Sequence, residues 1–528
     1  MAGDELLALA LVPLILAALV PASLIVAPFF IARQRTPMLS SASNVTTFAA
    51  VLAYLAVVLQ PVLALAGYDA RTTVPTSVMN DVVQLDIVSS AMFVLVSTLA
   101  VVVVRFSRSY LAGQRDLDRY ARSLLLTVAS ACVLVTSNNL AVLVLAWFAT
   151  DIGLHSLLTF YRSRRQAIIV AHKKFLLSRV ADACFVSSIV IIGSELGTLR
   201  IDVVNAVTRA SSGLSPTLHI ATVLMVFGVL LKSAQIPFHG WLQWVMEAPT
   251  PVSALLHAGV VNIGGFVMIR LAPLMGQAYI AQGILLGVGL FTTIIAALVM
   301  ATRVAVKGVL AWSTIGQMGF MLVQCGLGAW HLALMHLLAH SLYKAHTFLS
   351  SGSVVQQWRA SHLVHSRRTK LWHLLAALIV ATAAVAPFYL GTVIATEAAI
   401  GHVSNGIEPL ALVLGLSFAP MVGRAIAAGF RPFLIATWFA MGASAAYFGW
   451  HIGFEVIAPE INAGIEVSDL KWNIVVIGLG VLFLAQTILQ TWPNGRFSRW
   501  LQPHLVSGLY IDDWFTRVTF RLWPPGFQ

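Results

Sequence analysis

The sequence predicts an all-α polytopic membrane protein, and three observations lead to this fold class. Hydrophobic residues make up 59% of the 528 residues. Charged residues make up only 10%, whereas about 25% is usual in a soluble domain. Apolar runs of about 20 residues, long enough to cross a bilayer as a helix, recur along the whole chain. A protein with so little polar surface needs lipid as its main solvent.

We expect roughly fifteen transmembrane helices. The first apolar run follows Asp4 and Glu5. A cleaved signal peptide needs a positive start, so we expect a retained helix with its N-terminus outside. The expected spans lie near residues 5–31, 46–67, 84–104, 123–138, 140–160, 170–194, 216–238, 249–273, 279–301, 307–327, 329–352, 371–397, 408–428, 432–450 and 472–491.

Basic residues concentrate in alternate loops. Examples are "RSRRQ" with Lys173 and Lys174, and "RASHLVHSRRTK". The positive-inside rule places these loops in the cytoplasm together with the C-terminus. The net charge of +12 is therefore spread over short loops, whereas nucleic-acid binding needs a clustered basic face. No strand followed by "GxGxxG" is evident, so no nucleotide or flavin cofactor is expected on this chain.

A lysine and a proline interrupt the seventh run, in "LLKSAQIPFHGW". A charge at the bilayer centre costs at least about 2.5–3.5 kcal/mol, and proline breaks the interior of a helix. Broken backbone at this depth is tolerated only against protein or a water-filled cavity. Two interpretations of Lys232 remain open: it loads and releases a proton beside water, or it snorkels to the interface.

Histidines follow at helical spacing in "HLALMHLLAHSLYKAHTF". His336, His340 and Lys344 recur every four residues and share one helix face, and His257 lies on an earlier span. A metal pair, a proton relay and separately hydrogen-bonded core histidines are the possible interpretations. We favour the relay over the metal, because a zinc site needs a third ligand that is not evident here.

Two charged patterns lie earlier in the chain. Asp151 and His155 are four residues apart in "AWFATDIGLHS", and Arg179 and Asp182 are three apart in "SRVADACF". Residues at these spacings meet on one helix face. The pair of Arg179 and Asp182 is expected either to influence the proton affinity of a nearby lysine or only to dock helices.

Two glutamates lie at the ends of segments that contain a proline break. Glu247 precedes "APTP", and Glu397 ends the twelfth run, which Pro387 interrupts. Proline-broken spans in corresponding halves of a chain indicate repeats of the kind found in transporters. We therefore expect two discontinuous helices, in the seventh and twelfth spans.

Four segments together resemble a known family. They are "LLKSAQIPFHGWLQWVMEAPTPVSALLHAGVVNIGGF", "VKGVLAWSTIGQMGFM", "HLLAHSLYKAHTFLSSGSVV" and "SRVADACF". They resemble the proton-pumping membrane subunits of respiratory complex I and of the multisubunit cation/proton antiporters, over roughly residues 145–355. The resemblance implies an antiporter-like fold with two inverted five-helix repeats at 123–273 and 274–428. N-terminal helices at 1–122, and C-terminal helices with a cytoplasmic tail at 429–528, would flank them.

The resemblance also implies roles for individual residues. Lys232 matches the central pumping lysine, and Lys307 matches the lysine before "VLAWST". The histidines and Lys344 match the hydrophilic axis, and Arg179 with Asp182 matches its charged pair. Together with the residues found by spacing, the predicted proton or cation pathway contains Lys232, His257, Lys307, His336, His340, Lys344, Asp151, His155, Arg179, Asp182, Glu247 and Glu397.

Two departures from the family pattern point to one branch. "AWFATDIGL" has Thr150 where the family has glutamate, with Asp151 next, and "APFYLGTVIATE" lacks the distal lysine. "HSLYKAHTFLSSGSVVQQWR" is similar to the branch that pairs with a large soluble carbonic-anhydrase-like zinc subunit (DabA type) in the DAB inorganic-carbon accumulation complex. That branch implies a bacterial inner-membrane subunit whose cation flow energises CO2 or bicarbonate accumulation. It would not be catalytic on its own, and zinc would sit on the partner at the cytoplasmic face.

Other functions remain compatible with these features. One is a proton-pumping subunit of a complex I-like or hydrogenase-like oxidoreductase, and another is a cation/proton antiporter subunit. A scaffold that anchors a soluble protein, with charges that only dock helices, is the third.

Overall fold

A computed structural model describes residues 2–31, 38–66, 78–353, 370–400, 407–457 and 468–523. Within these ranges the chain is helical apart from short connections and two isolated β-bridges, Val83–Ser137 and Asn139–Arg200. The all-α prediction is therefore confirmed. The chain forms two compact units: unit 1 is Met1–Ala281, His336–Ser351 and Ile511–Gln528, and unit 2 is Gln282–Met335 and Gly352–Tyr510.

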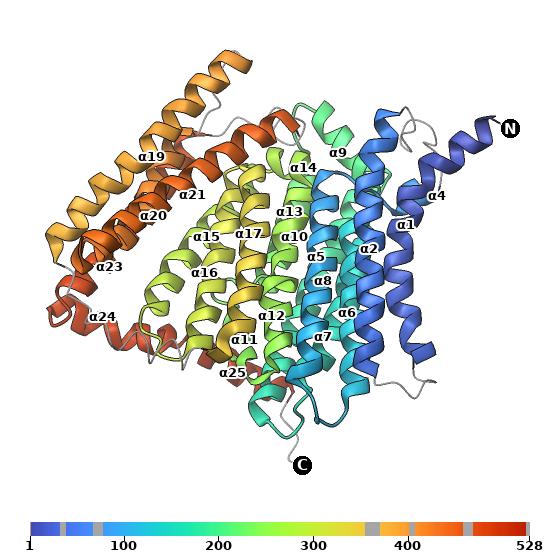
Figure 1. The fold of residues 1–528 in the computed structure, drawn as a ribbon, viewed down its shortest axis with the longest axis horizontal. Helices are drawn as coiled ribbons and strands as arrows, with labels where there is room; N and C mark the ends of the chain where they lie inside the picture. Colours follow the sequence, from blue (N-terminus) through green and yellow to red (C-terminus); the bar gives the residue numbers. More distant parts are fainter. Residues whose placement is uncertain are drawn as a thin grey trace. The chain divides into compact units, whose positions relative to one another are not determined.

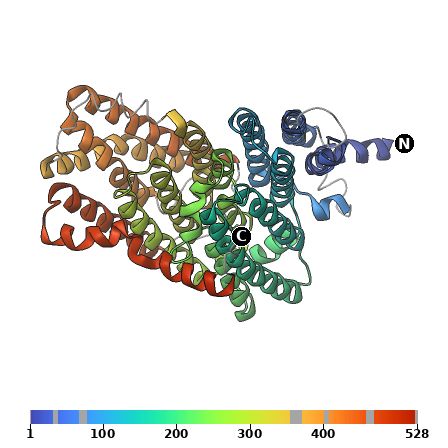
Figure 2. The same cartoon turned by 90° about the horizontal axis from the view of Figure 1, so that it is seen from below.

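Unit 1 is built around long helices that pack against their neighbours in the sequence. α1 and α2 lie side by side at one edge of this unit (Figures 1 and 2). α6 packs on α7, and α8 packs on both α7 and α10. The helices are α1 (Ala2–Ile31), α2 (Met38–Leu65), α4 (Val78–Val82), α5 (Ile87–Tyr110), α6 (Leu117–Thr136), α7 (Leu140–Leu158), α8 (Arg165–Leu196), α9 (Ile201–Ala210), α10 (Pro216–Lys232), α11 (Gly240–Gln243), η1 (Trp244–Glu247), α12 (Thr250–Ala258), η2 (Val260–Asn262), α13 (Ile263–Arg270), α14 (Ala272–Gln277) and α25 (Ile511–Leu522).

Unit 2 contains most of the remaining helices, and two α-helices have residues in both units. Those two are α15 (Tyr279–Met300) and α17 (Trp330–Leu349). α19 packs closely on α20 and α21 within unit 2. The short 3-10 helix η3 (Ser350–Ser353) also has residues in both units. The elements wholly within unit 2 are α16 (Val306–Gly326), α19 (Leu371–Ile400), α20 (Ile407–Ala428), α21 (Phe430–Ile457), α23 (Asp469–Thr491), α24 (Arg496–Val506) and η4 (Gly508–Tyr510).

Thirteen helices in the described part of the chain are long and apolar enough to cross a membrane, against roughly fifteen expected. The other two expected spans are also helical. α10 is an apolar helix of 17 residues, and α17 carries four histidines and a lysine among its 20 residues. The chain is therefore a multi-pass membrane protein.

The break expected in the seventh span is present. α10 begins at Pro216, where the side chain of Ser215 accepts a hydrogen bond from the N–H of Leu218 (3.2 Å). The helix ends at Lys232, and residues 233–239 form turns before α11 begins at Gly240. The lysine predicted beside a break is therefore the last residue of a helix.

The break expected in the twelfth span is wrong. α19 runs without interruption from Leu371 to Ile400, with Pro387 inside it. A proline removes one backbone hydrogen bond from a helix, but membrane helices tolerate this where neighbouring helices compensate. α19 is held by two such neighbours, α20 and α21, so Pro387 is accommodated within one continuous helix.

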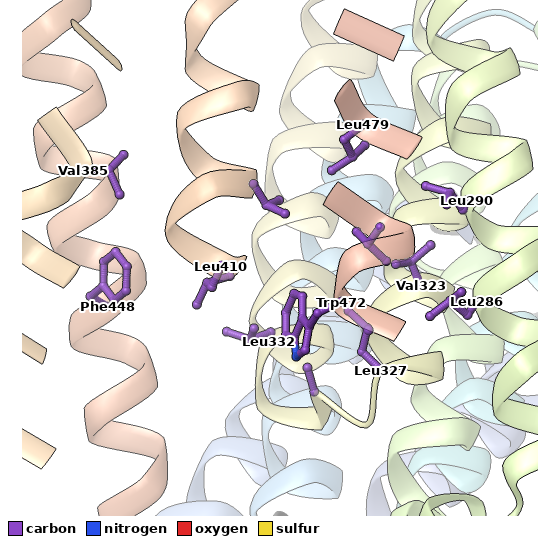
Figure 3. Packing of buried hydrophobic residues seen from close by; sticks show 13 residues of the cluster. Leu286, Leu290, Val323, Leu327, Leu332, Val385, Leu410, Phe448, Trp472 and Leu479 are labelled. Carbon is purple, nitrogen blue, oxygen red and sulfur yellow. The ribbon is translucent and has the colours of Figure 1, made fainter. Parts of the chain in front are cut away.

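Close packing of apolar side chains forms the core of unit 2 (Figure 3). Trp472 of α23 lies near Leu332 of α17, and Leu286 and Leu290 come from α15. Lipid tails are as apolar as these side chains, so van der Waals packing rather than the hydrophobic effect holds such helices together. The buried cluster contains Leu286, Leu290, Val323, Leu327, Ala329, Leu332, Val385, Leu410, Val413, Phe448, Trp472, Val475 and Leu479.

Candidate functional site: a buried charge cluster

Asp151 is carried by α7, whose start is fixed by a side-chain cap. The Asn139 side chain accepts a hydrogen bond from the N–H of Ala141 (2.9 Å), which satisfies one of the free donors at the start of the helix. Farther along, Gly153 permits close approach to α6, because a Cβ there would lie 3.2 Å from the carbonyl oxygen of Ser123. Asp151 itself is 2% exposed.

Two more helices bring cations and a second carboxylate to Asp151. α8 supplies Lys174, Arg179 and Asp182, and α10 supplies Lys232 as its last residue. Lys174 and Asp182 are eight residues apart, about two turns, so they share one face of α8. A cation in the last turn of a helix is stabilised by the carbonyl groups left unpaired there. The end of α10 therefore both positions the Lys232 ammonium and stabilises its charge.

These five side chains form one ion-pair network, called the charge cluster below. Asp151 accepts hydrogen bonds from Lys174 through Oδ1 and from Lys232 through Oδ2, the latter at 2.8 Å. Lys232 Nζ also pairs with Asp182 Oδ1 at 2.6 Å. Arg179 Nη2 pairs with Asp182 Oδ2 at 2.7 Å and lies 3.7 Å from Asp151. Arg179 and Asp182, predicted as a pair from their spacing, are indeed paired.

Three side chains of the charge cluster are almost sealed from solvent within the protein, whereas those of Arg179 and Asp182 are 26% and 13% exposed. The side chains of Lys174, Lys232 and Asp151 are 5%, 4% and 2% exposed. The aromatic rings of Trp147 and Phe185 lie 4.6 and 5.7 Å from the Lys232 ammonium, and their π faces attract a cation. The network holds three cations and two carboxylates, so one positive charge is in excess.

Four of the predicted residues form a second group in unit 1, carried by α12 and α17. His257, His340 and Lys344 are buried, and His336 is half-buried. The His336 and His340 rings are 6.1 Å apart, and the His257 ring stacks on Phe348 at 4.3 Å. His340 interacts electrostatically with His257, His336 and Lys344. Because these groups carry only positive charge when protonated, each bound proton opposes the next.

A hydrogen bond ties the two helices of this histidine group together. The amide nitrogen of Asn262, the last residue of η2, donates to the hydroxyl of Ser341 on α17 at 2.7 Å and to the carbonyl of Ala258, the last residue of α12, at 2.9 Å. Ser341 is 0% exposed, so a lost partner here would leave a buried polar group. The sequence prediction did not include Asn262 or Ser341.

The remaining predicted residues lie elsewhere. His155, one turn beyond Asp151, packs on Phe175 with ring centres 5.2 Å apart. Glu247 forms an exposed ion pair with Arg164 (3.3 Å). Lys307 is half-buried in the first turn of α16, in unit 2. Glu397 belongs to α19 in unit 2, and its side chain lies outside the described part of the structure.

Sequence reasoning missed the role of Lys174, which was counted among the basic residues of a cytoplasmic loop although it lies near the start of the expected span 170–194. In the structure it is inside α8 and bonded to Asp151. Its spacing of eight residues from Asp182 is the one sequence signal that could have revealed it. Hydropathy could not, because a lysine at the end of a polar loop looks the same whether it is solvated or buried.

The contacts of the C-terminal helix were also missed. Figure 1 shows α25 crossing the end of unit 1 at α11, and it contacts both α8 and α11. Asp512 pairs with the buried ammonium of Lys173 (2.7 Å), next to Lys174 in the chain. Just after α25, Trp523 stacks on His172 with ring centres 3.8 Å apart. α25 therefore docks on α8 close to the charge cluster.

A cavity of about 460 Å³ lies within unit 2 between α15, α16, α20 and α23. At about 30 Å³ per molecule this volume has room for about fifteen waters. Its polar lining consists of hydroxyl and amide side chains: Thr293, Ser313, Gln317, Ser417 and Gln486.

Within the described residues, no group of three or more histidine, cysteine, aspartate or glutamate side chains is arranged to hold a metal ion. The charge cluster contains two carboxylates, but three cations surround them. A metal cation would meet repulsion there, so the geometry suits proton exchange better than metal binding.

Comparisons with known proteins agree with this architecture. A sequence model of the family described as NADH:quinone oxidoreductase/Mrp antiporter, TM, matches residues 137–403. A protein of Halothiobacillus neapolitanus named probable inorganic carbon transporter subunit DabB2 is 37% identical over 439 residues, which cover 81% of this chain and 78% of that protein. The NADH-quinone oxidoreductase subunit L of Mycobacterium tuberculosis is 30% identical over 434 residues, 80% of this chain and 65% of that protein.

A solved structure supports the same fold. The structure of the Mrp complex from Dietzia sp. DQ12-45-1b matches with a TM-score of 0.61 at 19% identity. The match covers 99% of this chain and 59% of the matched chain. The sequence resemblance is thus confirmed, and the chain belongs to the NADH:quinone oxidoreductase/Mrp antiporter transmembrane family.

Proposed function

We propose that the chain is the proton-conducting membrane subunit of a complex that accumulates inorganic carbon. The charge cluster is the observation that carries this proposal. A buried ionisable residue in a membrane span is costly and indicates a functional site, of which ion pathways and proton relays are common kinds. Here five charged side chains from three helices meet in one network. The likeness to a protein named probable inorganic carbon transporter subunit supports the carbon substrate.

The pathway would start at the charge cluster and continue through the histidine group of unit 1. Both contain groups that exchange protons, and histidine does so near neutral pH. The cavity of unit 2, through the five hydroxyl and amide side chains in its otherwise mainly apolar lining, and Lys307 in the same unit would serve a second half-path. The predicted repeats at 123–273 and 274–428 supply the architecture for two such halves, with α10 as the discontinuous helix of the first.

Proton flow would drive chemistry on another subunit. The partner of this chain would be a large soluble carbonic-anhydrase-like protein with a zinc site, bound at the cytoplasmic face of a bacterial inner membrane. The N-terminus of this chain would lie outside and the C-terminus inside, in agreement with the basic residues of alternate loops. One charge that crosses 100 mV releases about 2.3 kcal/mol, which would bias a near-balanced CO2 hydration step substantially in one direction.

Replacing Lys232 by alanine tests the pathway. We expect Lys232→Ala to reach the membrane at normal levels and to lose bicarbonate uptake in cells that depend on this complex. Lys370→Ala is the matched control, because Lys370 is exposed at the start of α19 and should keep full uptake. Full uptake in Lys232→Ala would refute the pathway. Uptake that depends on sodium and resists protonophores would assign the cation as Na+ instead of the proton.

A second function is supported by the likeness to the Mycobacterium tuberculosis NADH-quinone oxidoreductase subunit L. In that case the same pathway would pump protons in a complex I-like or hydrogenase-like oxidoreductase. Purification of the tagged chain from its own membranes distinguishes the two. A zinc-containing soluble partner supports carbon accumulation, and iron–sulfur subunits support the oxidoreductase.

A further inference from the structure

The charge cluster contains one more cation than it has carboxylates. Arg179, Lys174 and Lys232 face Asp151 and Asp182. Burial penalises an unbalanced charge, so the cluster gains by giving up one proton. Arginine does not release a proton in proteins. The exchangeable proton therefore sits on one of the two lysines.

The two lysines have unequal surroundings. Lys232 contacts both carboxylates, at 2.8 Å and 2.6 Å. Its ammonium also faces the rings of Trp147 and Phe185 and lies at the C-terminal end of α10, where a helix stabilises positive charge. Lys174 bonds to Asp151 alone and sits inside α8.

We propose that Lys174, rather than Lys232, is the residue of the charge cluster that releases and rebinds the proton. This inference rests on the proposed function, and it changes which lysine carries the ion. An ammonium with one carboxylate partner loses less when it becomes neutral than an ammonium with two. Lys232 then remains a fixed cation that holds Asp151 and Asp182 in place.

The ionisable groups around Lys174 act in opposite directions, and the excess cation of the cluster is what favours release. Asp151 on α7 and Asp182 on α8 attract its charge, and Lys232 on α10 opposes it. His155 on α7 also interacts with Lys174. Release breaks one N–H bond of the Lys174 ammonium, the nitrogen keeps the electron pair, and water accepts the proton as hydronium. The remaining network has two cations and two carboxylates.

Arginine substitutions distinguish the roles of the two lysines, because arginine keeps the positive charge but cannot release a proton. We expect Lys174→Arg to lose proton-coupled bicarbonate uptake. Lys232→Arg should keep uptake clearly above that of Lys232→Ala, since a fixed cation still faces both carboxylates. Uptake retained in Lys174→Arg and lost in Lys232→Arg would overturn the inference and leave the proposed function intact. Wild-type uptake in both variants would refute the proposed pathway itself.

Two further variants remove any ambiguity from folding defects. Lys174→Met leaves a balanced cluster of two cations and two carboxylates, so it should reach the membrane at normal levels without uptake. Lys174→His places a group that titrates near neutral pH at the same position, so the alkaline limit of uptake should move to lower pH. Wild-type uptake in Lys174→Met, or a lower amplitude without a pH shift in Lys174→His, would show that Lys174 acts only in the structure.

Discussion

Replacing Asp151 by asparagine should destabilise the folded protein strongly, because Asp151 is the carboxylate that both buried lysines share. Its side chain is 2% exposed and bonds to Lys174 and Lys232. Without it the charge cluster would hold three cations and one carboxylate. Breaking a buried ion pair by removing one partner costs about 3–5 kcal/mol.

The cost of neutralising one lysine sets a limit on the stability that Asp151→Asn can lose. An ordinary lysine loses its proton near pH 10.4, about 3.4 units above pH 7, so at about 1.36 kcal/mol per unit its neutralisation costs about 4.6 kcal/mol. Asp151→Asn can always remove its second excess charge by neutralising one lysine in this way. The cost of that neutralisation is therefore an upper limit on the loss of stability, and it lies within the range of about 3–5 kcal/mol given above. Higher pH lowers this limit by about 1.36 kcal/mol per unit. The loss of stability should therefore shrink as the pH rises.

Thermal unfolding in detergent, followed by the fluorescence of the 14 tryptophans, measures the effect. Asp513→Asn is the matched control, because Asp513 is an exposed aspartate on α25 and its loss should leave the unfolding temperature unchanged. Adding Lys174→Met to Asp151→Asn removes one excess cation and should recover most of the lost stability. If Asp151→Asn unfolds at the temperature of the control at pH 7, the two buried lysines do not depend on Asp151 for their charge balance and the reasoning fails.

Two more predictions concern the ends of the helices. Asp512→Ala removes the partner of the buried Lys173 ammonium. The amide hydrogens of residues 511–522 should therefore exchange faster in Asp512→Ala than in the control Asp513→Ala. Equal exchange in the two variants would show that this ion pair does not dock α25. At Asp202, on α9, burial alone would raise the pKa, but the hydrogen bond from Arg200 holds it below its usual value. Such a carboxylate stabilises the fold above its ordinary pKa and loses that effect as the pH falls. Asp202→Asn should therefore flatten the fall of the unfolding temperature between pH 5 and pH 3, near the ordinary pKa of about 3.9. An unchanged dependence of the unfolding temperature on acid pH would contradict this assignment.

The sequence predicted the elements of the fold better than their contacts. Each expected span contains α-helix, although the span at 249–273 is interrupted at Gly259, and the break after Lys232 lies where proline and lysine indicated it. The break at Pro387 was wrong, because proline alone does not interrupt a helix that two neighbours support. Local composition thus identified where helices form, but packing decided whether a proline stops one.

The candidate site was predicted in part. The i,i+3 pair of Arg179 and Asp182 forms as expected, since residues at this spacing meet on any helix. Lys174 escaped prediction because its partner lies 23 residues away on another helix. Glu247 was expected beside the pathway but pairs at the surface with Arg164.

The amino-acid sequence by itself determined that this is a membrane protein. It also determined which segments are helices and which membrane spans carry ionisable groups. These properties depend on hydropathy and on spacing within one helix, which are local. Only the tertiary structure decided that Lys174 and Lys232 share Asp151, and that Asp512, 339 residues beyond Lys173, pairs with it. Contacts between distant segments depend on how helices pack, and no pattern within a single helix encodes that arrangement.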